Sequence, residues 1–123
     1  MAKRTRAEIL ALDDRPTETM FVPEWDTDLA LRGLTLAQLT NISERAKRDG
    51  ETDGLRATVF TLIEGVVEPR FDMGDYDALR NKSAGVVNRV SSRIMALSGM
   101  GAGAVDTATK NSEPTQDSAS GTS

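Results

Sequence analysis

Two short runs of alternating apolar and polar residues near the N-terminus predict a β-hairpin. The runs are Thr19–Val22 and Asp28–Arg32, and the segment between them has the sequence Pro-Glu-Trp-Asp-Thr. Leu29 and Leu31 fall on one face of the second run, as a half-buried strand requires. The proline of the segment has no N–H and suits the end of a strand, where no ladder hydrogen bond is lost. We therefore expect two antiparallel strands joined by a short loop.

A first helix is predicted to begin after Leu34. Thr35 and Gln38 have the spacing of a capping box, in which each side chain bonds a free backbone N–H of the other residue. The pair Asp49-Gly50 is predicted to end the helix, because glycine readily adopts the left-handed conformation found after helix C-termini. The predicted apolar face of this helix consists of Leu36, Leu39, Ile42 and Ala46.

Helical periodicity recurs three times in the rest of the chain. One helix is predicted from about Thr52 to Glu64, a short one from about Gly74 to Arg80, and a third principal helix over Ala84–Ser98, capped by Ser83 and ended by Gly99. The apolar stripes of the two longer helices are Leu55, Val59, Leu62, Ile63 and Val66, then Val86, Val87, Val90, Ile94 and Leu97. We expect a shared core that includes Leu39, Ile42, Leu62, Val90 and Ile94.

These elements predict a mainly α fold with a small N-terminal β-hairpin, that is, an α+β fold of three principal helices and one short helix. Residues 1–15 form a charged arm that we interpret as a frayed terminus, with the alternative that Ile9, Leu10 and Leu12 form part of a short amphipathic turn. Residues 16–100 form the hairpin and helical domain. Residues 101–123 are rich in Gly, Ser, Thr and Ala, and we expect them to be disordered because they cannot bury enough apolar surface.

Composition excludes several classes of function. The 123-residue chain contains no cysteine and no histidine, which removes disulfides, thiolate or imidazole metal sites and histidine-assisted catalysis. Its net charge of -4 argues against binding to nucleic acid, which needs a clustered basic surface. No apolar run approaches the roughly 20 residues that span a bilayer. We therefore predict a non-enzymatic protein with no cofactor, no metal, no nucleic-acid partner and no membrane partner.

Three sequence features resemble chemical sites but have simpler structural explanations. The glycine-rich stretch at residues 99–104 lacks the strand and the Lys-Ser/Thr of phosphate-binding loops, so we interpret it as a linker. The carboxylates of residues 49–53 and 72–77 do not have EF-hand spacing and are interpreted as helix caps and turns. Ser83 follows a lysine, yet a serine directly before an apolar periodic run is the expected N-cap.

Trp25, the single tryptophan, admits two interpretations. It could fold back over the hairpin and seal a small core, or it could project as an anchor for a partner protein, a role in which tryptophan is enriched. We favour the structural role. The candidate partner-binding residues of the hairpin are Phe21, Pro23, Trp25, Leu29 and Leu31.

The order of these features resembles a known family. The segments "VPEW", "DLALR", "LT", "EPRF", "LRNKSAGVVNRVSSRIMALSG" and "KNSE" follow one another in the arrangement of the tail assembly chaperones of long-tailed, siphovirus-like bacteriophages. The resemblance covers residues 8 to 112, and its weight lies in the order and spacing of short motifs. Asp26-Thr27-Asp28 stands where that family would have a glycine-containing turn.

The resemblance implies a non-enzymatic role in the host bacterial cytoplasm. Members of this family bind the tape measure protein, keep it soluble and give way as the tail tube polymerises around it, so the protein would be absent from the mature virion. The resemblance also admits the major tail tube protein and a longer, frameshifted form of the chain itself as partners. The alternative expectation is a small structural virion subunit, such as a head-tail connector or tail completion protein.

Overall fold

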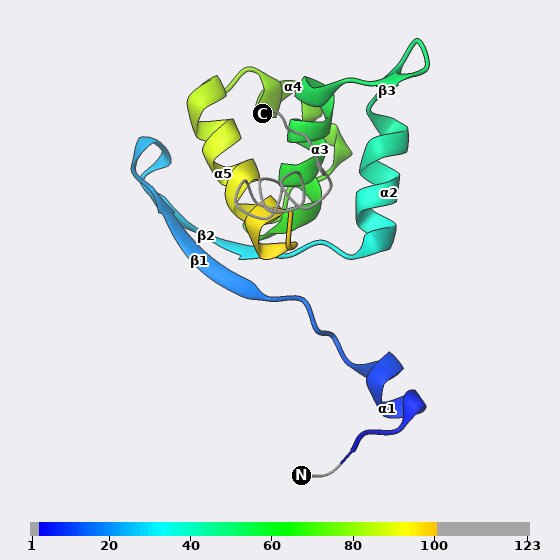
Figure 1. Cartoon of the computed structure of the whole chain (residues 1–123). Coiled ribbons are helices and arrows are strands. Elements are labelled where there is room, and N and C mark those ends of the chain that lie inside the picture. The colour runs from blue at the N-terminus through cyan, green and yellow to red at the C-terminus, as the bar shows by residue number, and fades with distance from the viewer. Residues whose placement is uncertain (1–2, 101–123) are drawn as a thin grey trace, which may run out of the picture.

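The computed structural model describes residues 3–100, so the predicted disorder of residues 101–123 lies outside the described residues. The chain has a mixed α+β fold, with a small antiparallel sheet against a group of helices (Figure 1). In chain order the elements are α1 (Arg6–Ala11), β1 (Thr17–Val22), η1 (Pro23–Trp25), β2 (Thr27–Arg32), α2 (Leu36–Arg45), β3 (Lys47–Arg48), β4 (Glu51–Thr52), α3 (Gly54–Gly65), β5 (Val66–Glu68), η2 (Met73–Asp75), α4 (Tyr76–Arg80) and α5 (Ala84–Leu97).

The predicted hairpin is present, with slightly longer strands. β1 and β2 pair antiparallel, and Leu29 lies opposite Met20 on the face that meets the helices. Val22, Leu29 and Leu31 are fully buried there. Asp26 closes the loop in the left-handed conformation, with φ 49° and ψ 49°. Aspartate tolerates this conformation better than most residues, so the loop forms without a glycine.

The β structure is more extensive than one hairpin, and the prediction of a mainly α fold is corrected accordingly. β5 pairs antiparallel with β2 and extends the sheet to the order β1-β2-β5, with Val66 opposite Leu31 and Glu68 opposite Ala30. Val67 is the extra residue of a bulge between these two pairs. Val66 was assigned to the stripe of the preceding helix, but it is a β-branched residue, and its side chain is buried beside β2.

The Asp49-Gly50 pair does not end a helix. α2 already ends at Arg45, and the two residues instead turn a small ribbon, β3–β4. Their φ angles of 54° and 85° are both positive, as the central positions of a type I′ turn require. Asp-Gly is a strong signal for such a hairpin as well as a possible helix end, so the predicted helix end at this pair is wrong.

The core lies between the inner face of the sheet and helices α2, α3 and α5 (Figure 1). Of the residues predicted to share it, four are buried and Leu39 is partly buried; the buried ones are Ile42, Leu62, Val90 and Ile94. Leu36 and Leu55 were assigned to apolar stripes but are 83% and 79% exposed. Both lie in the first turn of their helix, beyond the region where neighbouring elements cover the surface.

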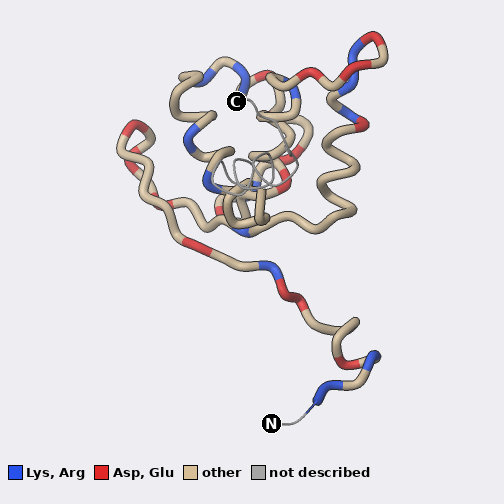
Figure 2. Tube along the Cα trace, viewed as in Figure 1, with Lys and Arg blue, Asp and Glu red and all other residues tan. Residues whose placement is uncertain are grey.

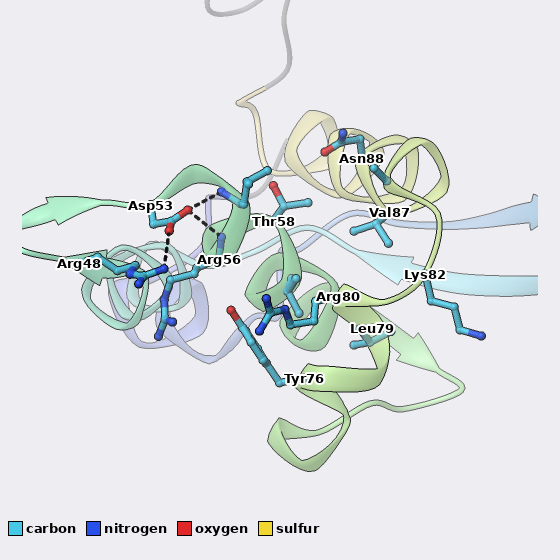
Figure 3. Close-up of a pocket in the computed structure, with 13 residues that line it drawn as sticks. Arg48, Asp53, Arg56, Thr58, Tyr76, Leu79, Arg80, Lys82, Val87 and Asn88 are labelled. Carbon is cyan, nitrogen blue, oxygen red and sulfur yellow. Dashed lines mark hydrogen bonds and ion pairs between the residues drawn. The ribbon is translucent and has the colours of Figure 1, made fainter.

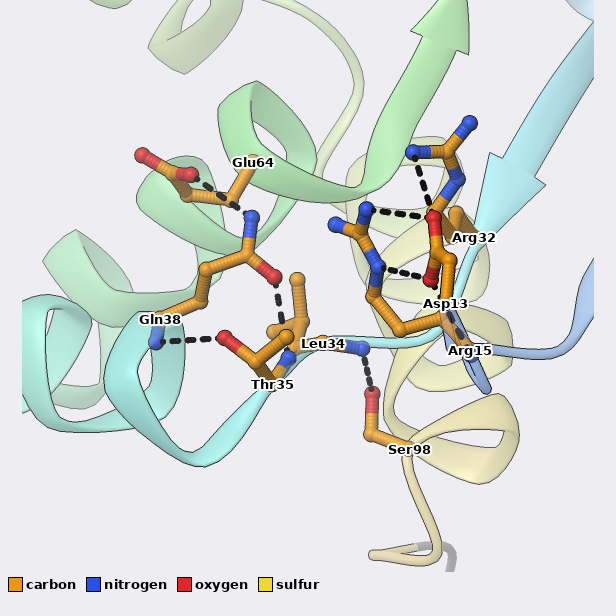
Figure 4. Close-up of polar contacts among 8 residues, drawn as sticks. All are labelled: Asp13, Arg15, Arg32, Leu34, Thr35, Gln38, Glu64 and Ser98. Atoms are coloured by element: carbon orange, nitrogen blue, oxygen red, sulfur yellow. Dashed lines mark hydrogen bonds and ion pairs between the residues drawn. The ribbon is translucent and has the colours of Figure 1, made fainter. Parts of the chain in front are cut away.

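The helix ends follow the predicted chemistry with one exception. Thr35 Oγ1 accepts a hydrogen bond from the Gln38 N–H at 3.1 Å, and Gln38 Oε1 accepts one from the Thr35 N–H at 2.9 Å, which completes the capping box (Figure 4). Ser83 occupies the N-cap position of α5, but its hydroxyl makes no capping hydrogen bond, so that prediction is wrong. Gly99, with φ 80°, ends α5 as predicted.

The predicted short helix is divided in two. η2 begins at Met73 and passes directly into α4. Asp72 caps η2 by accepting a hydrogen bond from the Gly74 N–H at 2.8 Å. Asp53 likewise caps α3 by accepting from the Leu55 N–H at 2.9 Å. Both aspartates thus act as helix caps, as the sequence interpretation proposed.

Candidate functional site

The N-terminal arm carries apolar side chains that have no core around them. α1 is held by a local capping box between Thr5 and Glu8, with hydrogen bonds of 2.8 and 3.1 Å. None of its residues is buried, and Figure 1 shows the helix standing away from the body. Ile9, Leu10 and Leu12 are 55%, 68% and 48% exposed. A short helix thus stands where a frayed terminus was the favoured interpretation, in agreement with the alternative of an amphipathic turn, and its apolar side faces solvent.

The base of the arm is tied to the sheet by polar contacts. Asp13 accepts hydrogen bonds from Nε and Nη2 of Arg15, each at 2.9 Å, and lies 3.8 Å from Nη1 of Arg32 in β2 (Figure 4). These hydrogen bonds to Arg15 hold the pKa of the Asp13 carboxyl well below its usual range. The Gly33 N–H also donates to the Pro16 carbonyl at 2.8 Å. The arm therefore leaves the body from a defined point beside the sheet.

The five candidate residues of the hairpin divide into exposed and buried groups. Phe21 is 57% exposed and Pro23 is exposed as well. Trp25 is partly buried and packs against the core, which supports its structural role. Leu29 and Leu31 are fully buried and offer no surface to a partner in this conformation. The exposed apolar side chains thus lie at two places, with Phe21 and Pro23 at the loop end of the hairpin and the arm before the opposite end of β1. We call the set of Ile9, Leu10, Leu12 and Phe21 the arm-hairpin surface.

Two arginines of α5 clamp the hairpin onto the helical body, and sequence reasoning missed both. Nη1 and Nη2 of Arg89 lie 3.2 and 2.5 Å from the carboxylate oxygens of Glu24 in η1. Nε and Nη2 of Arg93 lie 2.5 and 2.6 Å from those of Glu18 in β1. Arg89 and Arg93 are four residues apart and therefore share one helix face. This spacing was the available signal, but the glutamates lie more than sixty residues earlier in the chain.

Figure 2 shows the basic positions along α5 beside the acidic residues of the hairpin. The hydrogen bonds from Arg93 and Arg89 lower the pKa values of Glu18 and Glu24 from their ordinary value of 4.5. A bidentate pair of this kind has a defined geometry, which fixes the angle between the hairpin and the helix as well as attracting opposite charges. Both pairs are exposed to solvent, so their contribution to stability is modest and screened by salt.

Acidification is expected to weaken this clamp. Because the folded pKa values of Glu18 and Glu24 lie below the ordinary 4.5, the two pairs stabilise the fold fully above that pH and lose their contribution as the pH falls through the lower folded values. We predict that the double variant Glu18→Gln, Glu24→Gln has a lower urea midpoint than the wild type at pH 7, and that this difference shrinks at pH 3.

Glu51→Gln provides the control, since Glu51 makes no ion pair with any residue in the range 3–100. The free energy of unfolding of this variant at pH 7 should lie within about 0.5 kcal/mol of the wild-type value. A difference between the double variant and the wild type that stayed constant from pH 7 to pH 3 would show that the carboxylates do not act through their ionised form.

Two kinds of site were sought in the described part of the chain, namely metal-binding clusters and membrane-spanning helices. Within residues 3–100 no group of three or more acidic, histidine or cysteine side chains is placed to hold a metal ion. Over the same residues, no helix combines the length and the apolar character needed to cross a membrane. Comparison of the chain with protein-family models, with curated proteins and with solved structures finds no match.

Proposed function

We propose that this protein is a tail assembly chaperone of a long-tailed bacteriophage, which binds the tape measure protein in the host bacterial cytoplasm. The resemblance in the order of sequence motifs suggests the partner. The observation that carries the proposal is the arm-hairpin surface, where four large apolar side chains are 48% to 68% exposed on elements that project from the core. A chaperone of this kind would cover apolar positions of its partner and perform no chemical reaction.

The size of this surface suits reversible binding. Full burial of an exposed Leu, Ile or Phe side chain contributes about 1.5–3 kcal/mol, and these side chains are already about half covered. Burial of the four side chains would therefore contribute roughly 3–6 kcal/mol. Association costs about 4–15 kcal/mol, so this contribution offsets only the lower end of that range. One copy would bind weakly, many copies would coat a long partner, and tail tube subunits could displace them. The net charge of -4 would keep the complexes dispersed.

Co-expression tests the proposal. The partner to use is the product of the very long, coiled-coil-rich reading frame that the chaperone hypothesis expects immediately downstream of this gene. The wild-type chain should move that protein from the insoluble to the soluble fraction. A variant with Ile9→Ser, Leu10→Ser and Phe21→Ser should lose most of this effect while keeping the melting temperature of the wild type, because the three side chains are exposed.

Leu36→Ser is the matched control, since Leu36 is 83% exposed on α2 and does not belong to the arm-hairpin surface. It should rescue the partner as the wild type does. If Leu36→Ser lost as much of the solubilising effect as the triple variant, the arm-hairpin surface would have no specific role. If the wild-type chain did not bring the partner into the soluble fraction, the chaperone function would be contradicted. Detection of the protein in purified virions by mass spectrometry would favour the structural virion subunit instead.

A further inference from the structure

A basic pocket lies beside the N-terminal half of α3. It has a volume of about 330 Å³ and is formed between β3, α3, α4 and the start of α5 (Figure 3). Four basic side chains and one acidic side chain are among the residues that line it, which gives it a net charge of three positive in a chain whose net charge is -4. These five are Arg48, Asp53, Arg56, Arg80 and Lys82.

Arg56 is held in place at the pocket by aromatic side chains. Its guanidinium carbon lies 6.0 Å from the ring centroid of Phe60 and 5.9 Å from that of Tyr76, within the range of cation–π contacts. One terminal nitrogen donates to the Arg45 carbonyl at 3.4 Å. The Nε atom is covered by protein and has no hydrogen-bond partner among the described residues. The fold therefore positions this guanidinium firmly but leaves much of its donor capacity unused.

The other cations of the pocket are also incompletely paired. Arg48 lies 3.7 Å from Asp53, whose carboxylate already accepts hydrogen bonds at the N-terminus of α3. Arg80 approaches Asp77 only to 4.0 Å, and both side chains are largely exposed. Lys82 forms no ion pair within residues 3–100 and points outward in Figure 3. Within residues 3–100 the positive charge is thus only partly neutralised and can attract an anion.

Apolar side chains form part of the remaining lining, beside the polar Thr58, Tyr76 and Asn88, and they restrict the kind of anion that the pocket suits. Val59, Leu79 and Val87 line it, and Leu55 stands at its rim with 79% of its surface exposed. A small inorganic anion would leave this apolar wall uncovered. A nucleic acid would need a basic surface extending over several phosphates, whereas the chain outside the pocket is acidic overall.

We propose that this pocket binds a short acidic segment of a partner protein. A carboxylate of the segment accepts hydrogen bonds from the terminal nitrogens of Arg56 and Arg80, in the paired geometry that guanidinium groups favour. A neighbouring leucine or similar side chain of the same segment covers the exposed Leu55. The inference rests on charge complementarity and is separate from the proposed chaperone function, because it concerns a different face of the molecule.

The test uses the full chain and two fluorescein-labelled peptides of twelve residues. One contains glutamate and leucine at i, i+4 spacing, and the other has every glutamate replaced by glutamine. Fluorescence anisotropy should detect binding of the acidic peptide, at least about tenfold weaker binding of the glutamine peptide, and weakening by added salt. Arg56→Gln and Arg80→Gln should each weaken binding of the acidic peptide at least about fivefold.

Arg70→Gln is the matched control, since it removes the same charge from an exposed residue outside the pocket. It should leave the affinity unchanged within twofold. Arg80 is exposed, so its variant keeps the wild-type fold, and circular dichroism checks this even if Arg56→Gln is destabilised. The proposal would be overturned if the two peptides bound equally well, or if Arg70→Gln and Arg80→Gln weakened binding equally. It would also be overturned if an equal concentration of inorganic phosphate displaced the acidic peptide, because that result would identify a phosphate site.

Discussion

Leu29→Ala is expected to lower the free energy of unfolding by about 2–5 kcal/mol. The Leu29 side chain is fully buried in the core, and Leu29 lies opposite Met20 in the register of the hairpin. Truncation removes buried methyl groups and leaves a cavity that the surrounding sheet and helices can only partly fill. Urea denaturation followed by far-ultraviolet circular dichroism measures the change, which is a large part of the total stability of a domain this small.

Phe21→Ala is the comparison for Leu29→Ala, because it truncates a larger apolar residue in the same hairpin. Phe21 points to the outer face, where it is 57% exposed, and we expect a loss of about 1 kcal/mol or less. The two results together separate the core face of the hairpin from its surface face. If Leu29→Ala cost less than Phe21→Ala, the inner face of the hairpin would not be packed on the helices as described.

Gly65→Ala is expected to destabilise the protein by about 1–3 kcal/mol through overpacking. Gly65 ends α3 and faces the Ile94 side chain of α5. A Cβ atom added there would overlap Cγ2 of Ile94 and would lie only 2.7 Å from its Cδ1 and 2.9 Å from its Cγ1. Ile94 is fully buried and cannot swing into solvent to make room. Thermal unfolding would show the effect as a lower melting temperature.

A second substitution checks this explanation for Gly65→Ala. In the Ile94→Ala background the added methyl group should fill part of the new cavity, so Gly65→Ala should cost less there than in the wild type, or even stabilise. Gly54→Ala is the matched control at the other end of α3, since nothing lies within 4 Å of its added Cβ. It should stabilise by about 0.5–1 kcal/mol, because alanine has the higher helix propensity. A Gly65→Ala loss that persisted unchanged in the Ile94→Ala background would rule out the contact as its cause.

Local patterns in the sequence predicted the elements whose causes are themselves local. The hairpin follows from alternation in β2, the start of α2 from the Thr35–Gln38 capping box, and the end of α5 from Gly99. Each depends on residues within a few positions of one another, so the chain alone contains the needed information. Four of the five predicted core residues are buried for the same reason, since helical periodicity places them on one face.

Tertiary structure alone decided the features that join distant parts of the chain. β5 exists because β2 offers a partner to Val66, and without that pairing the same residue continues a helical stripe. The roles of Leu29 and Leu31 changed from candidate contacts to core, because burial depends on what packs over a strand. The Arg89 and Arg93 clamps join α5 to residues more than sixty positions away. The basic pocket gathers its cations from β3, α3, α4 and the segment that leads to α5. No run of basic residues in the sequence indicates that pocket, because its positive charge comes from basic side chains that the packing of separate elements brings together.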